Sequence, residues 1–170
     1  MTRNNLRSRI LLALTIAAMT TGISTAAFAA TDTDPVAVSA SITSSCILSA
    51  GTMAFGAYSP LSGAASDVSG SITVTCTDGT AWALTADIGL GAGATFASRK
   101  MTHTNTTSLL NYSLYTEGTH TTAWDATTGT ITGTGNGAAQ ATTFYGRIFG
   151  SQETALPGSY SDTVTVTVTY

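Results

Sequence analysis

Residues able to carry chemistry are few in this 170-residue sequence, and they lie far apart. It contains two histidines, His103 and His120, and two cysteines, Cys46 and Cys76. A metal site needs more ligands than these, and the Cys-x-x-Cys spacing of a redox pair is absent. There is also no Gly-x-Ser-x-Gly motif and no recognisable triad spacing of Ser, His and Asp. The sequence therefore predicts no catalytic residue, no metal and no cofactor.

Isolated acidic residues are the remaining catalytic alternative. Asp67, Asp78, Asp87 and Asp125 fall in predicted turns or at strand ends, where aspartate commonly caps the local backbone. A glycosidase-like carboxylate pair is not visible from spacing, so that alternative stays open, although local caps are favoured. The run from Gly89 to Gly93 lacks the Lys-Ser/Thr of a phosphate loop, and we interpret it as a flexible turn.

The first 29 residues match a signal peptide. Basic residues precede a mostly apolar run from Ile10 to Ile23, and Ala27-Phe-Ala29 then fits a signal-peptidase site. The run is too short and too rich in threonine for a membrane anchor, so we expect cleavage after Ala29 and no membrane insertion afterwards. In an exported protein the even pair Cys46 and Cys76 is expected to form a disulfide.

Removing this leader leaves three basic residues against nine acidic ones, a net charge of −6. The dibasic pair Arg99-Lys100, which we place on a loop, and Arg147 cannot form a surface for nucleic acid. Charged residues are only 9% of the chain, far below the usual quarter. Such a surface suits a protein covered by neighbouring subunits, and about 140 residues predict one domain.

Apolar and polar residues alternate with a period of two near both ends of the mature chain. Residues 160–170 predict one strand, with a row of apolar side chains on one face and threonines on the other. A second alternating strand is expected at residues 36–43, close behind the mature N-terminus. The inward-facing residues are predicted to be Val36, Val38, Ala40 and Ile42 in the first region and Val164, Val166, Val168 and Tyr170 in the last.

Between these ends lie several short strand patterns separated by turn residues, which predict an all-β sandwich. We expect strands at residues 71–76, 82–88, 109–115 and 142–148, with a weaker one around Ala123 and Trp124. The aromatic residues in or beside them are predicted to pack in the core rather than to bind sugars. They are Trp82, Trp124, Tyr112, Tyr115 and Phe144.

Six motifs in order give the chain a resemblance to a known family, the spore coat protein U domain. They are Cys46-Ile-Leu-Ser, Phe55-Gly-Ala-Tyr58, Gly70-Ser-Ile-Thr-Val-Thr-Cys76, Leu110-Asn-Tyr-Ser-Leu-Tyr115, Tyr145-Gly-Arg-Ile148 and Gly158-Ser-Tyr-Ser-Asp-Thr-Val164. Each motif is weak alone, but their order, together with the cysteine pair and the terminal aromatic residue, is specific. The mature chain as a whole therefore resembles the subunits of archaic chaperone–usher pili.

The resemblance implies an incomplete immunoglobulin-like β-sandwich that lacks its final strand and is completed by donor-strand complementation. Residues 1–29 would be the signal peptide, residues 30–45 the N-terminal extension that acts as donor strand, and residues 46–170 the pilin domain. The donor positions would be Val36, Val38, Ala40 and Ile42. Val164, Val166, Val168 and Tyr170 would line the acceptor groove, and Cys46 and Cys76 would match the family disulfide.

The function implied is a structural subunit of an extracellular pilus that supports surface attachment or biofilm formation. Its partners would be neighbouring copies or related pilins, a periplasmic chaperone and an outer-membrane usher, on a route through the periplasm to the cell surface. Three alternatives remain: a spore-coat or cell-surface matrix protein that forms no regular fibre, a tip adhesin, and an enzyme. A tip adhesin usually carries a second, receptor-binding domain, for which this chain has no room.

Overall fold

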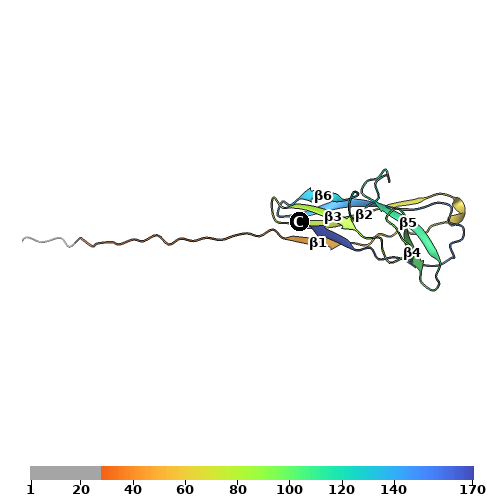
Figure 1. Ribbon diagram of the computed structural model, residues 1–170, viewed down its shortest axis with the longest axis horizontal. Helices are drawn as coiled ribbons and strands as arrows, with labels where there is room; N and C mark the ends of the chain where they lie inside the picture. The colour runs from red at the N-terminus through yellow and green to blue at the C-terminus, as the bar shows by residue number, and fades with distance from the viewer. Residues whose placement is uncertain (1–27) are drawn as a thin grey trace, which may run out of the picture. The chain divides into compact units, whose positions relative to one another are not determined.

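The computed structural model describes residues 28–170 (Figure 1). The signal peptide predicted for residues 1–29 lies almost entirely outside the described residues and remains a prediction. Of the described residues, those from 28 to 40 and those from Ser41 onward belong to two separate units. Within residues 28–45 no helix or strand is assigned, so the strand predicted at residues 36–43 does not form within this chain. Alternation makes a strand only where a neighbouring backbone pairs with it.

The second unit is built from β-strands, in agreement with the predicted all-β class (Figure 1). The strands are β1 (Cys46–Ala50), β2 (Ser66–Cys76), β3 (Ala81–Ala86), β4 (Arg99–His103), β5 (Leu109–Tyr115), β6 (Ile131–Thr134), β7 (Ala139–Ile148), β8 (Tyr160–Ser161) and β9 (Val166–Thr169). One turn of 3-10 helix, η1 (Pro60–Ser62), joins β1 to β2, and no α-helix is assigned within residues 28–170.

The strands form two sheets with antiparallel pairing. The six-stranded sheet has the order β1-β2-β7-β5-β4-β8, and the three-stranded sheet has the order β6-β3-β9. The longest ladder of the six-stranded sheet joins β2 to β7, from Ser66 opposite Ile148 to Thr75 opposite Ala139. In the smaller sheet, β9 pairs with β3 on one side, and no described strand pairs with its other side. This unpaired edge is the structural basis of the site described below.

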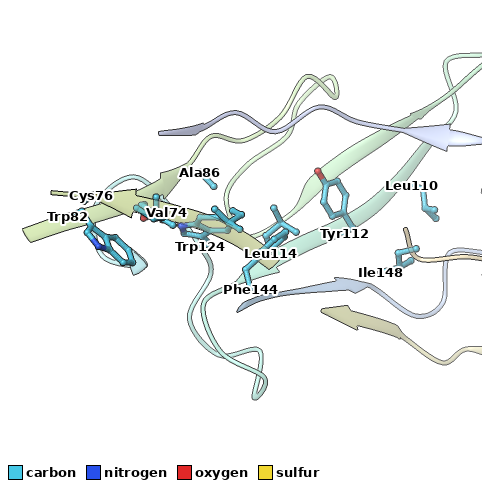
Figure 2. Close-up of a cluster of buried hydrophobic side chains, with 12 residues drawn as sticks. Val74, Cys76, Trp82, Ala86, Leu110, Tyr112, Leu114, Trp124, Phe144 and Ile148 are labelled. Atoms are coloured by element: carbon cyan, nitrogen blue, oxygen red, sulfur yellow. Dashed lines mark hydrogen bonds between the residues drawn. The ribbon is translucent and has the colours of Figure 1, made fainter. Parts of the chain in front are cut away.

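The core lies between the sheets and comes from the even-numbered residues of β2, β3, β5 and β7, because alternate side chains point to one face. Trp124 has no exposed surface, and its ring centroid lies 5.2 Å from that of Phe144. Figure 2 shows both rings beside Leu114. The Trp124 indole N–H donates to the Leu84 carbonyl oxygen at 3.1 Å. This bond joins the loop after β5 to the opposite sheet.

Two sequence-based expectations are corrected here. Arg99 and Lys100 lie in β4 rather than on a loop, and Arg99 is fully buried. The weak strand expected around Ala123 and Trp124 is only a single bridge, between Ala123 and Tyr115, and the strand of this region is β6. The predicted core placement is confirmed for Trp82, Trp124, Tyr112 and Phe144, whereas Tyr115 is half-buried on the outer face.

Candidate strand-acceptor groove

An open apolar groove runs between the segment that follows β1 and the terminal stretch of the chain. Its first part is a cavity of about 420 Å³, with Trp124, Phe144 and Ile72 among its lining residues. A second cavity, of about 720 Å³, extends along residues 53–60 to Pro157. The side chains of Met53, Phe55, Met101 and Tyr160 line both cavities. The two cavities therefore form neighbouring parts of one groove, which we call the acceptor groove.

The terminal stretch is not the single strand that its alternation predicts. Residues Tyr160 and Ser161 form β8 on β4 of the larger sheet, and β9 on β3 of the smaller sheet starts only at Val166. Residues 162–165 cross from one sheet to the other. Side-chain alternation continues through this crossing because both halves bury the same face, and so the pattern conceals the change of sheet.

The four predicted groove residues fall in different places. Val164 and Val166 line the first cavity, while Val168 packs against the core beyond it. Tyr170 is 57% exposed, and it lines a separate shallow hollow with Trp82 on the smaller sheet. The inward-facing row of the terminal stretch therefore ends at Val168.

The unpaired edge of β9 is made by the same valines. Thr165 accepts a bond from the Asp87 N–H at 3.0 Å, so its backbone faces β3. Successive residues of a strand direct their N–H and C=O groups to opposite sides, so Thr167 and Thr169 face β3 as well. The N–H and C=O groups of Val164, Val166 and Val168 then face the groove. One row of residues thus presents backbone groups at the edge and apolar side chains to the core.

The predicted donor residues are solvent-exposed. The side chains of Val36, Val38 and Ile42 are 85%, 90% and 87% exposed, and Ala40 is exposed too. Isolated exposed apolar residues are ordinary, but three large ones on one parity within seven residues form an uncovered apolar row. The side chains of this row are aliphatic, so none of them is a catalytic or ligand-binding group.

The two cysteines form the predicted disulfide. Cys46, the first residue of β1, is bonded to Cys76, the last residue of β2, and the two residues face each other in the strand register. The bond closes a loop over a sequence separation of 30 residues. It joins the point at which the N-terminal segment enters the sandwich to the longest ladder of the larger sheet.

Two aspartates hold the crossing between β8 and β9. The Asp162 carboxylate accepts bonds from the Leu90 N–H and the Tyr112 hydroxyl, both at 2.7 Å, and from the Thr163 N–H at 2.8 Å. The Asp87 carboxylate accepts bonds from the Gly89 and Thr165 N–H groups, each at 2.9 Å. These contacts tie the crossing to the loop after β3 and to β5.

The same contacts shift the pKa values of these groups. Burial raises the pKa of Asp87, but the bonds from Thr165 and Gly89 outweigh burial, and the net pKa lies below the ordinary aspartate value. Burial, followed by the hydrogen bond to Asp162, raises the pKa of the Tyr112 phenol far above its usual range. Asp87 is therefore ionised, and Tyr112 is a neutral hydroxyl donor, throughout the physiological pH range.

The hydrogen bonds of Arg99 all go to backbone oxygens, one of them that of Asp87. Its Nε and Nη2 donate to the Asp87 carbonyl at 2.9 and 2.7 Å, its Nη2 to the Trp124 carbonyl at 2.6 Å and its Nη1 to the Phe96 carbonyl at 3.2 Å. Burial lowers the pKa of this guanidinium, although arginine stays protonated. Arg99 therefore holds the backbone of Asp87, Phe96 and Trp124 together from inside the fold. The dibasic sequence Arg99-Lys100 does not indicate this role.

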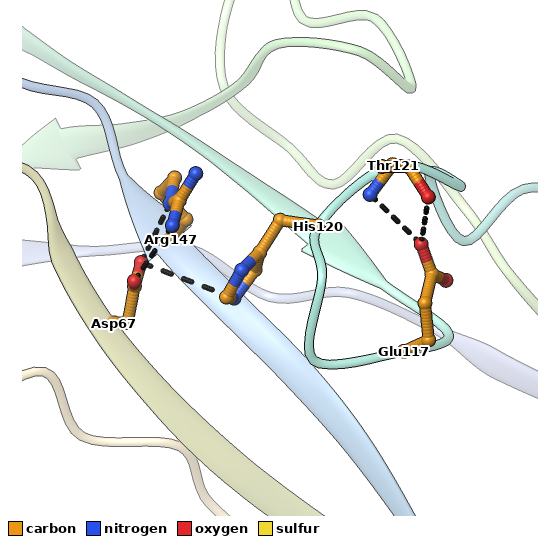
Figure 3. A network of polar contacts seen from close by, with 5 residues as sticks. All are labelled: Asp67, Glu117, His120, Thr121 and Arg147. Atoms are coloured by element: carbon orange, nitrogen blue, oxygen red, sulfur yellow. Dashed lines mark hydrogen bonds and ion pairs between the residues drawn. The ribbon is translucent and has the colours of Figure 1, made fainter.

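A second polar cluster joins β2 and β7 of the larger sheet to the loop after β5 (Figure 3). Asp67 on β2 accepts two bonds from Arg147 on β7, both at 2.7 Å. The bond from Arg147 lowers the pKa of Asp67, and in return raises that of Arg147. His120 packs edge-on against Tyr115, and its Nε2 lies 3.9 Å from the Asp67 carboxylate. This cluster fastens the loop after β5 to the sheet.

Within residues 28–170, no group of three or more His, Cys, Asp and Glu side chains is placed to hold a metal ion. The searched residues also contain no helix that is long and apolar enough to cross a membrane. Asp67 and Asp87 make the ion pair and the backbone contacts described above. Asp125 accepts bonds from the N–H groups of residues 127–129, each at 2.8 Å, as expected of a local cap.

Comparison with known families identifies the class of the protein. The Spore Coat Protein U domain family model matches residues 32–167, and the chain belongs to this family. One family domain thus covers most of the chain, as its six motifs predict. No curated protein matches the sequence.

The fold is also similar to a solved structure. This is the crystal structure of the CsuC–CsuE chaperone–tip adhesion subunit pre-assembly complex from archaic chaperone–usher Csu pili of Acinetobacter baumannii. The match to one of its chains has a TM-score of 0.59 at 19% identity and covers 76% of this chain and 40% of that chain. The chain therefore spans two-fifths of the chain that it matches, and at this identity the likeness concerns the fold alone.

Proposed function

We propose that the protein is a structural subunit of an extracellular pilus, assembled by the chaperone–usher pathway through donor-strand exchange. One observation carries the proposal: β9 presents an unpaired edge beside an open apolar groove in a sandwich with no described strand to fill it. Membership of the Spore Coat Protein U domain family and a fold shared with a chain of an archaic pilus complex support it.

The proposed occupant of the groove is the segment from Val36 to Ile42 of another copy or of a related pilin. As a strand, these seven residues would span about 23 Å. Pairing would satisfy the groove-facing N–H and C=O groups of Val164, Val166 and Val168, and alternate donor side chains would enter the cavities. Burial of two valines and one isoleucine contributes roughly 1.5–3 kcal/mol each.

Exchange of this kind produces a filament. The donor segment and the groove are different surfaces of one chain, so each copy gives a strand to one neighbour and receives a strand from another. Such a heterologous contact does not close on itself and continues head to tail. Before assembly, a periplasmic chaperone would occupy the groove, and an outer-membrane usher would pass the subunits to the cell surface. No enzymatic activity is part of this proposal.

Deletion of residues 36–42 tests the proposal. The deleted segment contains no helix or strand, so the shortened subunit should still fold and bind its chaperone, yet form no polymer. Both properties are measurable by co-purification with the chaperone and by electron microscopy of cells that also express the usher. Normal fibres from the deletion variant would refute the donor role, and amorphous surface material from the intact protein would favour a matrix protein instead.

A matched pair of substitutions sharpens this test. Val38→Asp places a carboxylate on the donor face and should abolish polymerisation, because an unpaired charge would enter an apolar groove. Ser39→Asp adds the same charge one residue later, on the opposite face of the extended segment, and should be tolerated. Equal loss of fibres in both variants would show that the total charge of the segment controls assembly, and not whether the charge faces the groove.

A further inference from the structure

The crossing between β8 and β9 forms one wall of the acceptor groove. The first cavity is lined by Asp162, Thr163 and Val164 and by Val166, the first residue of β9. β8 has two residues and β9 has four. Strands this short, one of them unpaired on the groove side, have few ladder bonds of their own to keep them extended. Contacts from outside the ladder must therefore hold the wall.

Asp162 supplies three of these contacts from a single side chain. Its carboxylate receives N–H or O–H donors from its own segment, from the loop after β3 and from β5, namely Thr163, Leu90 and Tyr112. Tyr112 is itself only 4% exposed, so its ring is fixed in the core. Hydrogen bonds to a charged acceptor are stronger than those between neutral groups. The crossing is thus anchored to both sheets at one point.

Asp87 makes a similar contact with Thr165, which lies three residues after Asp162. Its carboxylate accepts the Thr165 N–H, while its own N–H donates to the Thr165 carbonyl oxygen at 3.0 Å. An ordinary ladder would use the Asp87 carbonyl oxygen for the first of these bonds, but that oxygen is occupied by Arg99. The aspartate side chain replaces it, so that the start of β9 keeps full pairing on the β3 side.

We propose that Asp162 and Asp87 are positioning residues for strand acceptance, which hold the groove-facing edge of β9 in strand geometry while the adjacent strand position is empty. This inference rests on the proposed function and specifies how the groove stays ready for its donor. The two residues act through the backbone of residues 162–166, and the arriving strand contacts that backbone.

Preorganisation of this kind has a kinetic signature. If only a fraction of molecules keeps the edge extended, the rate of productive association falls in proportion to that fraction. Once the donor strand is bound, it pairs with the free edge and holds β9 itself, so the dissociation rate changes little. A residue that contacted the donor directly would instead change mainly the dissociation rate.

The experiment uses the chain with residues 36–42 deleted, so that no internal donor competes, and a fluorescent synthetic peptide of residues 33–45. Association and dissociation rates are measured for the parent chain, Asp162→Ala, Tyr112→Phe and the control Asp78→Ala, whose side chain is exposed in a turn. We expect about 10-fold slower association for Asp162→Ala and about 3-fold for Tyr112→Phe, with dissociation rates within about 2-fold of the parent. The control should match the parent.

The outcomes separate this inference from the proposed function. If the parent chain does not bind the peptide, strand acceptance itself is refuted, and this inference with it. A second outcome is that the parent binds while the Asp162→Ala and Tyr112→Phe variants associate as fast as the parent, or differ from it only in dissociation rate. In that case the positioning role is refuted and the proposed function stands. Should Asp162→Ala fail to fold, Tyr112→Phe, which loses only one hydroxyl, decides the question alone.

A second measurement uses a chain in which residues 36–42 are attached after Tyr170 through a flexible linker. With the groove filled, β9 is held from both sides, and the shift in urea midpoint caused by Asp162→Ala should be less than half of that in the unfilled chain. An equal shift in both chains would mean that Asp162 stabilises the fold without regard to the groove, and would overturn the inference.

Discussion

Replacement of Arg99 by methionine gives the sharpest test of how the sandwich is held beneath its groove wall. Methionine keeps much of the side-chain volume but removes all four hydrogen bonds, and the carbonyls of Asp87, Phe96 and Trp124 lose a buried donor. Relief of the guanidinium's desolvation and loss of its charge-assisted bonds are opposite terms of similar size. What remains is the cost of the orphaned carbonyls, at about 1–3 kcal/mol each.

Since water can reach part of this site after the substitution, we expect the free energy of unfolding to fall by about 3–5 kcal/mol. The assay is urea unfolding followed by tryptophan fluorescence, because Trp124 accepts one of the lost bonds. Arg99→Lys should retain most of the loss, because an ammonium group lacks the planar fork that reaches several carbonyls.

The matched control is Arg147→Met, which removes an arginine from β7 of the same sheet, separated from β4 by β5. Arg147 pairs with Asp67 at the surface, where their side chains are 34% and 45% exposed, respectively. Surface pairs contribute about 1 kcal/mol or less. If Arg99→Met and Arg147→Met destabilise the protein equally, burial of the Arg99 clamp has no special energetic role and the reasoning fails.

Three further predictions concern other parts of the fold. Replacing Cys46 and Cys76 together by alanine should lower the free energy of unfolding by about 3–4 kcal/mol, because the bridge closes a 30-residue separation; reduction of the native protein should give the same loss in a urea titration, and an unchanged midpoint would contradict it. Hydrogen bonds outweigh burial and lower the pKa of Glu117 to about 2, and bonds led by a backbone N–H lower that of Asp125 to about 2. Both carboxylates therefore stabilise the fold above their ordinary pKa values and lose this contribution as the pH falls from about 4.5 to about 2, so Glu117→Gln combined with Asp125→Asn should flatten the acid limb of a stability–pH profile. Gly91→Ala should cost about 1–3 kcal/mol, because a Cβ there would overlap a backbone carbonyl of β4, and a neutral result in thermal unfolding would show that the loop gives way freely.

Alternation predicted the sheets wherever one face is buried and the strand keeps one partner. Residues 71–76 were predicted as a strand from Ile72, Val74 and Cys76, and the structure buries all three within β2. In the terminal stretch the same logic placed Val164 and Val166 on the face that lines the groove, as the structure does. It did not predict that the chain passes from the larger sheet at β8 to the smaller sheet at β9. Alternation records which face is buried and carries no information about the neighbouring strand.

The polar contacts that set the groove wall could not be predicted, because they join residues far apart in the sequence. Asp162 meets Leu90 across 72 positions, and Arg99 meets Trp124 across 25. In the sequence, Arg99 and Lys100 look like a solvated dibasic pair. Only the strand geometry of β4, which directs adjacent side chains to opposite faces, buries Arg99 and leaves Lys100 partly exposed. The disulfide also joins distant residues, 30 positions apart, but it was predictable because two cysteines allow a single pairing.

The position of that disulfide has a mechanical consequence. In a fibre of the proposed kind, a pulling force enters each subunit through its donor segment and reaches the sandwich first at Cys46. There the covalent bond passes the load directly to Cys76 and the long β2–β7 ladder. The five-residue β1 is bypassed, so it cannot be peeled away one hydrogen bond at a time. Under tension, the donor strand would then be pulled out of the acceptor groove before β1 detached from its own subunit.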